Sequence, residues 1–242
     1  MAQIVAKKHK KTFVQKINEE HIAGMICTAP FTIGFLLFMI VPMLISAYYS
    51  FCDFNILQPA TFIGFENYKT MFADAKFWKS LSVTLYFAFV SVPLRLVFAL
   101  IVAMILLKTS KATAFYRAAY YLPSIIGGSV AVAILWKRMF AIDGTINVLL
   151  RGIGIDSKVA WLGRTDTAIW TLIILSIWQF GSSMLIFLSS LKQIPTTLYE
   201  AGQIDGANAG KRFFKITLPL LTPTIFFNLV MQMINGFLAF TQ

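Results

Sequence analysis

Residues 167–191 read TAIWTLIILSIWQFGSSMLIFLSSL and contain no charged side chain. A helix needs about 20 predominantly apolar residues to cross the hydrocarbon layer of a membrane. Soluble domains usually carry charge on about a quarter of their residues. Here only 13% of the 242 residues are charged and 58% are hydrophobic. The stretch therefore predicts a transmembrane helix and places the chain among integral membrane proteins.

Four further stretches have the same character. Residues 80–107 are interrupted only by Arg95, and the other stretches contain long runs without charge. We therefore expect an all-α integral membrane fold, because each stretch is long enough for one crossing. The five predicted transmembrane helices lie at about residues 22–50, 80–107, 116–136, 167–191 and 216–240.

Several of these predicted helices contain residues that break a regular backbone. Pro93, Pro123 with Gly127-Gly128, and Gly181 lie inside them. A broken helix is tolerated in a membrane where neighbouring helices or a watery cavity satisfy its backbone. Such interruptions are typical of a moving transport bundle, although ordinary packing kinks are the alternative.

The positive charges predict an orientation. The chain carries 21 Lys and Arg against 10 Asp and Glu, a net charge of +11. Twelve of these cations lie in the tail 1–21 and in the connections after the second and fourth spans; eight lie in the other two connections. Because Lys and Arg concentrate in cytoplasmic loops, we expect residues 1–21 to form a cytoplasmic tail. No nucleic-acid partner is expected, since no basic face with interleaved aromatic residues remains outside the spans.

This orientation places residues 53–79 and 137–166 outside the cell. Both connections are rich in turn formers, among them Gly64 in the first and Asp143-Gly144 in the second. Within the first connection we expect a short helix over Glu66–Lys79 that lies on the membrane interface and is anchored by aromatic residues.

The connection between the fourth and fifth spans has the most distinctive local sequence. Pro195 ends the fourth span, and Thr197 and Glu200 have the spacing of a capping box. A short helix is therefore expected from Leu198 to Gly206, with a second helical stretch over Asn208–Lys215.

Small residues dominate the surface of this short helix. Six of the residues from 201 to 210 are glycine or alanine. A helix with so little side-chain bulk cannot build a core alone, and it suits close docking into a groove of another protein. On physical grounds, a tight cytoplasmic loop held by its caps is an equal alternative.

The order of residues in this helix resembles the EAA motif of ABC-importer permeases. That motif reads E-A-A-x-x-D-G-A and is followed at a fixed spacing by F-x-x-I-x-L-P. Gly202 stands where a second alanine is usual, which keeps the surface small but lowers helix propensity by up to ~1 kcal/mol. The matching residues are Glu200, Ala201, Gly202, Asp205, Gly206 and Ala207, followed by Phe213, Ile216, Leu218 and Pro219.

Other segments extend the resemblance to the carbohydrate-uptake group of binding-protein-dependent ABC permeases. Residues 62–68 look like the glycine–asparagine–tyrosine segment after the first span, and residues 116–123 look like the arginine–proline entry to the third. The external loop is similar at Asp143-Gly144, Asn147 and Trp161-Leu162. The similarity runs from about residue 20 to the end of the chain.

The resemblance implies a transport subunit rather than an enzyme. Two permeases, here expected to differ from one another, pair in the lipid of the bacterial cell membrane. Each places a coupling segment, here 195–215, in a cleft of an ATPase dimer. An extracytoplasmic sugar-binding protein delivers the substrate. ATP and Mg²⁺ bind the ATPase, so no cofactor is expected on this chain. The motif residues from Glu200 to Ala207 are thereby assigned to contact with the ATPase.

A phosphate-binding loop on this chain itself is not expected. Gly206 to Lys211 superficially resembles one. The loop requires four residues between its glycines and a serine or threonine after the lysine. Here three residues separate Gly206 from Gly210, and Arg212 follows the lysine.

Polar residues on two predicted spans form candidate linings for a substrate path. Thr224, Asn228, Gln232 and Asn235 fall within about 80° of one another on a helix. Ser176, Gln179, Ser183 and Ser190 form a weaker stripe on the fourth span. Hydrogen bonding between helices explains such residues equally well. The residues that we assign to the path are Trp178, Gln179, Ser183, Asn228, Gln232 and Asn235.

Arg95 lies in the middle of the second span, directly after Pro93 and Leu94. An arginine at a helix centre costs roughly 2.5–3.5 kcal/mol on insertion scales, so it must face a partner or water. Since no span offers a carboxylate, contact with backbone carbonyls or with the partner permease is favoured over contact with substrate.

Three alternatives stay open. A self-sufficient secondary transporter or channel would need intramembrane carboxylates or histidines for ion coupling, and the uncharged stretches contain none. An ABC permease for a non-sugar solute would share the same motif. A structural assembly subunit would have no transport path. Since the family has six spans, we also expect a missing sixth span and hence a truncated gene product.

Overall fold

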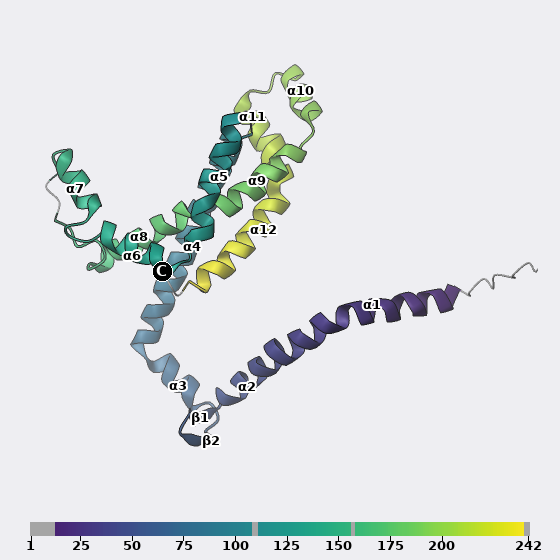
Figure 1. Cartoon of the computed structure of the whole chain (residues 1–242), viewed down its shortest axis with the longest axis vertical. Coiled ribbons are helices and arrows are strands. Elements are labelled where there is room, and N and C mark those ends of the chain that lie inside the picture. The colour runs from purple at the N-terminus through teal and green to yellow at the C-terminus, as the bar shows by residue number, and fades with distance from the viewer. Residues whose placement is uncertain (1–12, 108–110, 156–157, 240–242) are drawn as a thin grey trace, which may run out of the picture. The chain divides into compact units, whose positions relative to one another are not determined.

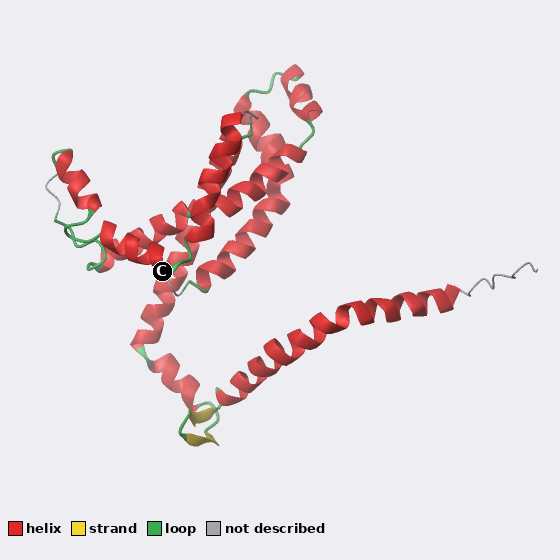
Figure 2. Cartoon of the chain, viewed as in Figure 1, coloured by secondary structure: helices red, strands yellow, loops and turns green. Residues whose placement is uncertain are grey.

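The computed structural model describes residues 13–107, 111–155 and 158–239. The chain divides into two compact units, residues 1–78 and 79–242. Helices make up most of the described residues (Figure 2). Three of them are long and apolar enough to cross a membrane, and the number rises to five if two bent helix pairs each make one crossing. The predicted α-helical membrane fold is therefore confirmed, with one local exception.

The first unit consists of a long helix followed by a small hairpin. Helix α1 (Phe13–Phe35), the π-helical turn η1 (Leu36–Ile40) and α2 (Val41–Tyr49) follow one another directly. Strand β1 (Cys52–Asn55) pairs antiparallel with β2 (Gln58–Phe62), and α3 (Glu66–Ala73) follows. Residues 1–12 of the predicted cytoplasmic tail lie outside the described residues, and residues 13–21 belong to α1.

The β-hairpin corrects the all-α prediction for this connection. Its strands are short and almost wholly exposed, so they lack the alternating pattern that reveals a half-buried strand. Asn67 of α3 connects this helix to the hairpin. Its Nδ2 donates hydrogen bonds to the carbonyl oxygens of Ser50 (3.0 Å) and Cys52 (2.9 Å). The Tyr68 hydroxyl adds a 2.7 Å hydrogen bond with Ser50 Oγ.

The interfacial helix predicted over Glu66–Lys79 is shorter than expected. It ends at Ala73, because Asp74 takes an extended backbone conformation. The Asp74 carboxylate then accepts a 2.8 Å hydrogen bond from the Lys76 amide, where the next helix begins.

The second unit contains the remaining helices, the first of which, α4, begins four residues before the boundary between the units. Helix α5 packs against α9, and α9 packs against α12, so these three lie side by side (Figure 1). The buried core joins α4, α9 and α12 through residues such as Leu96, Met184, Phe187 and Leu221. The helices are α4 (Ala75–Ile105), α5 (Lys111–Ile126), α6 (Val130–Met139), α7 (Thr145–Gly152), α8 (Thr165–Trp178), α9 (Gly181–Gln193), α10 (Thr196–Ile204), α11 (Ala209–Arg212), the π-helical turn η2 (Phe213–Thr217) and α12 (Leu218–Phe237).

The third predicted span is not a single helix. Helices α5 and α6 meet at an angle of 99° where Gly127-Gly128 interrupts the backbone, so the stretch predicted as one span over 116–136 is a bent pair that is long and apolar enough to cross a membrane only when both helices are taken together. Ser129 begins the new helix, because its hydroxyl accepts a hydrogen bond from the Val132 amide. The fourth span has a milder bend of 42° between α8 and α9, at the position of Gly181.

Gly181 is required by a close approach of two backbones. A Cβ atom at this position would lie 2.3 Å from the Tyr120 carbonyl oxygen and 2.7 Å from Tyr121 Cα. We expect Gly181→Ala to lower the free energy of unfolding by about 1–3 kcal/mol, because backbone atoms cannot move aside as a side chain can.

Thermal unfolding of the purified protein in detergent measures this effect. Gly152→Ala is the matched control, since a Cβ there would meet no atom within 4 Å. Equal melting temperatures for the two variants would contradict the packing of α5 on α9.

Candidate functional site

Two features of the second unit concern function: the short helix α10 with its flanking turn, and a polar cavity among α4, α5, α8, α9 and α12. Helix α10 follows α9 and is attached to the start of the long helix that contains α12. The Tyr199 hydroxyl forms a 2.9 Å hydrogen bond with Thr217 Oγ1. A Cβ on Gly202 would lie 3.1 Å from Ile216 Cδ1, so this side of α10 packs closely on η2.

The start of α10 differs from the predicted capping box. The helix begins at Thr196 with Pro195 at the N-cap, and no side chain caps it. Pro195 has an extended backbone conformation, which places Thr197 inside the first turn rather than before it. The helix therefore starts two residues earlier than predicted.

The end of α10 follows the glycine signal. Gly206 has a φ of +70°, a conformation that glycine adopts without the steric penalty of a side chain. The amides of Gly206 and Ala207 return to the carbonyls of Gln203 (3.0 Å) and Gly202 (2.8 Å). Asn208 then starts the next helix, because its Oδ1 accepts a 2.8 Å hydrogen bond from the Lys211 amide. That helix continues through η2 into α12, so the predicted stretch over Asn208–Lys215 and the predicted fifth span form one continuous helix from Ala209 to Phe237.

The motif residues divide between two faces of this segment. Glu200, Ala201, Asp205 and Gly206 are exposed, whereas Gly202 and Ala207 are half-buried, and Gly202 lies against Ile216 of η2 and Arg212 of α11. Ile204 lies in the exposed group and has 87% of its surface accessible. The glycine that replaces the usual alanine thus lies on the inner, packed side, and the outer side stays available to another protein.

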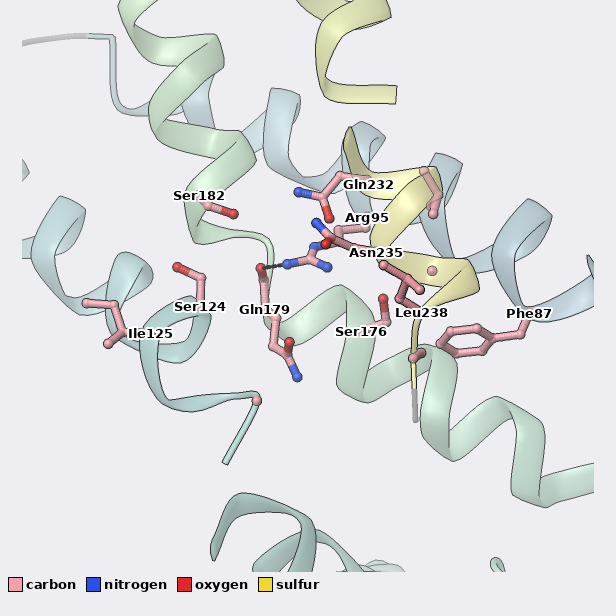
Figure 3. A pocket seen from close by; sticks show the side chains of 14 residues that line it. Phe87, Arg95, Ser124, Ile125, Ser176, Gln179, Ser182, Gln232, Asn235 and Leu238 are labelled. Carbon is pink, nitrogen blue, oxygen red and sulfur yellow. Dashed lines mark hydrogen bonds between the residues drawn. The ribbon is translucent and has the colours of Figure 1, made fainter. Parts of the chain in front are cut away.

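A cavity of about 390 Å³ lies between the bent helices and α12. This volume is in the range of small-molecule sites. Arg95 lies between α4 and the bend that follows α8, with Gln232 and Asn235 of α12 nearby (Figure 3). The polar residues that line the cavity are Arg95, Ser124, Ser176, Gln179, Ser182, Gln232 and Asn235.

Hydrogen bonds fix the wall of this cavity. The Gln179 side chain donates through Nε2 to the Gly127 carbonyl (3.1 Å), which joins the two helix breaks. Arg95 donates through Nη2 to the Gln179 backbone carbonyl. Gln232 donates through Nε2 to Ser183 Oγ (3.0 Å). Four buried side-chain polar atoms have no hydrogen-bond partner in the described part of the chain: Ser91 Oγ, Arg95 Nε, Arg117 Nε and Gln232 Oε1. Of their residues, Arg95 and Gln232 line the cavity.

The connection 137–166 is organised around a buried asparagine. Asn147 Nδ2 donates to the carbonyls of Ala141, Ile142 and Val159 at 2.9–3.2 Å, and its Oδ1 accepts from Trp161 Nε1 at 2.9 Å. Gly144 is needed beside it, since a Cβ there would lie 2.3 Å from the Met139 carbonyl oxygen. These contacts give a structural reason for the glycine, asparagine and tryptophan noted in the sequence of this loop.

Comparison with known proteins identifies the family. A family model described as the binding-protein-dependent transport system inner membrane component matches residues 70–242. This chain belongs to that permease family. The predicted membership of the ABC-importer permeases is confirmed by this match and by the names of the relatives.

Relatives of this permease cover most of the chain. It is 54% identical to the "Probable ABC transporter permease protein YesP" of Bacillus subtilis, over 94% of the chain and 74% of that protein. It is 34% identical to the "Probable starch degradation products transport system permease protein AmyD" of Thermoanaerobacterium thermosulfurigenes, over 88% of the chain and 73% of that protein. The chain also superposes on a crystal structure of a bacterial ABC transporter involved in the import of the acidic polysaccharide alginate. The TM-score is 0.76, the sequence identity is 25%, and the match covers 93% of this chain and 77% of the other.

The permease cavity includes only some of the predicted path residues. Gln179, Gln232 and Asn235 line it. Ser183 lies behind Gln232 and holds its amide. Asn228 is 1% exposed and donates to the Thr224 carbonyl of its own helix, so it is a packing residue here. The Trp178 ring lies tilted beside that of Trp136, with 6.1 Å between ring centroids, and it does not line the cavity.

The structure also adds residues that the sequence prediction of the path left out. Arg95 contacts a backbone carbonyl, as the sequence favoured, and it lines the cavity as well. Ser124 and Ser182 line it because each lies one residue after a helix breaker, Pro123 or Gly181. The sequence signal that could have identified these two cavity residues is a serine directly after a helix-breaking residue inside a predicted span.

Proposed function

We propose that this chain is one of two permease subunits of an ABC importer that takes up a sugar or oligosaccharide. The supporting observation is that an exposed E-A-G-x-x-D-G-A helix is attached to the start of a long helix whose far end lines a polar cavity. Amides and hydroxyls in that cavity are the groups that hydrogen-bond sugar hydroxyls.

The names of relatives support the substrate class. They include permeases of transport systems for starch degradation products, trehalose and maltose, lactose, and arabinooligosaccharides. We take a carbohydrate as the substrate of this chain on the strength of that pattern.

The proposed assembly contains an ATPase dimer, a second and different permease subunit, and an extracytoplasmic sugar-binding protein. Helix α10 docks in an ATPase cleft, and ATP with Mg²⁺ binds the ATPase subunits only. The chain crosses the lipid of the bacterial cell membrane with its amino terminus in the cytoplasm, in accordance with the distribution of Lys and Arg.

Reconstitution tests this function. The chain is purified together with the products of its neighbouring genes and placed in liposomes. We expect ATP hydrolysis to depend on the ATPase subunits and to rise when the binding protein and its sugar are added. The chain alone should neither bind nor hydrolyse ATP.

A matched complex whose ATPase lacks its phosphate-loop lysine is the control and should neither hydrolyse ATP nor transport. Sugar movement by the chain alone, without ATP, would instead establish a self-sufficient transporter. Stimulation by non-sugar solutes alone would establish a different permease substrate.

A further inference from the structure

One charge lies in the polar cavity. Arg95 is the only charged residue among the described residues that line it. The lining comes from residues 80–142, 167–199 and 206–239, and these parts of the sequence contain no aspartate or glutamate. The charge of this arginine is therefore not neutralised by a carboxylate within the chain's own cavity.

The contacts of Arg95 leave most of its donors free. Its Nη2 donates to the Gln179 carbonyl, which is the C-cap of α8, so the partial negative charge of that helix end offsets part of the guanidinium charge. A guanidinium has five N–H donors, and Nε is buried without a partner in the described part of the chain. Figure 3 shows the guanidinium beside the Gln179 backbone carbonyl, with the Gln232 and Asn235 side chains nearby.

The polar neighbours match the rest of an acidic sugar. Gln232 is 7% exposed and its Oε1 has no partner among the described residues, so a buried acceptor lies close to the arginine. Asn235 and Ser182 add donors and acceptors on either side. An adjoining cavity of about 450 Å³, which shares Phe87, Gly236 and Ala239 with the first, contains Lys79 and no acidic residue in its lining.

We propose that Arg95 binds the carboxylate of an acidic sugar unit, so that the substrate of this importer is an oligosaccharide containing uronic acid. The free edge of the guanidinium matches a carboxylate in geometry and charge. Gln232 Oε1 accepts a hydrogen bond from a hydroxyl of the same sugar. This inference rests on the proposed function and specifies its substrate.

The test compares acidic and neutral sugars of the same size. The complete importer is reconstituted in liposomes, and ATP hydrolysis is measured with trigalacturonate and trimannuronate, each beside its neutral counterpart, galactotriose or mannotriose. We expect an acidic sugar to stimulate more strongly than its counterpart. The preference is the ratio of the stimulation by the acidic sugar to that by its neutral counterpart. Arg95→Gln should lower this ratio by about 10- to 100-fold, which corresponds to the usual free energy of a hydrogen bond to a charged group. Arg95→Lys should retain most of it.

A purely structural role for Arg95 predicts a different result. Loss of the contact with Gln179 alone would lower stimulation by acidic and neutral sugars equally. Arg117→Gln is the matched control: Arg117 also donates to a backbone carbonyl, that of Leu106, and also has an unpartnered Nε, but it does not line the cavity. Its acid-to-neutral preference should match that of the unsubstituted importer.

Two outcomes overturn the inference in distinguishable ways. Stimulation by the neutral sugars alone, unchanged in its preference by Arg95→Gln, would leave a sugar importer without a carboxylate site. Stimulation by no member of either series would contradict this inference alone, because the proposed function is tested separately by reconstitution with the sugar of the binding protein.

Discussion

Replacement of Ile204 by aspartate is expected to abolish coupling between this permease and its ATPase. Ile204 is 87% exposed at the end of α10, so a charge there costs little in the isolated subunit. In the proposed complex the same charge would be buried in the ATPase cleft. Central interface residues commonly contribute 2 kcal/mol or more, so we expect transport to fall roughly 30-fold or further.

Copurification of the ATPase with the tagged permease and sugar-stimulated ATP hydrolysis measure this loss. Ile153→Asp is the matched control, because Ile153 is 73% exposed and follows another short helix, α7. The two variants should reach the membrane in equal amounts. If the Ile204→Asp permease still copurified with the ATPase in normal amounts, the assignment of α10 as the coupling helix would be wrong.

The cavity wall is expected to divide the amides of α12 by accessibility. In a background with Cys27 and Cys52 replaced by alanine, Asn235→Cys should react readily with a water-soluble thiol reagent. Asn228→Cys should react more than about 10-fold more slowly, because Asn228 is buried between helices and only local opening would expose it. The rate at Asn235 should change when ATP is added to the complete importer.

The pair Asn228 and Asn235 acts as an internal comparison, since both lie on one helix. Fast labelling of both cysteines would restore the original prediction that the whole stripe faces the path. Protection of both in every state would show that the cavity is closed to water.

Hydrophobic length predicted most helices of the membrane fold, because about 20 apolar residues can satisfy a bilayer in only one way. The angle at a break could not be predicted in the same manner. Gly127-Gly128 and Gly181 both signal an interruption, yet the bends are 99° and 42°. Contacts between residues distant in sequence hold these breaks, such as the hydrogen bond from Gln179 to the Gly127 carbonyl, and local sequence rules do not predict them.

Helical periodicity placed Asn228, Gln232 and Asn235 on one side of α12, but a side about 80° wide can meet both a neighbouring helix and a cavity. The residues of neighbouring helices decide which of these side chains packs against a helix and which faces the cavity. Ser190 forms a hydrogen bond with Thr224 (2.8 Å), and Ser183 holds Gln232, so α9 covers the first part of the stripe. Only Gln232 and Asn235 reach the cavity.

The hairpin and the start of α10 could not be predicted from local sequence patterns, because a residue outside each pattern decides the structure. Strands β1 and β2 bury little and depend on Asn67, fifteen residues after Cys52, for attachment. The capping-box pattern was correct in spacing, but Pro195 fixes the backbone one residue before Thr196 and takes the cap position.

The hydrogen bond between Tyr199 and Thr217 links α10 directly to the long helix from Ala209 to Phe237, so that this helix can act as a lever on its far end. From Thr217 to Asn235 this lever is about 27 Å long at 1.5 Å per residue. A tilt of about 10° at the α10 end would therefore move the Asn235 end by roughly 5 Å, a stroke as large as one turn of helix. In the proposed importer, a movement of α10 imposed by the ATPase would reach Gln232 and Asn235 along this one helix.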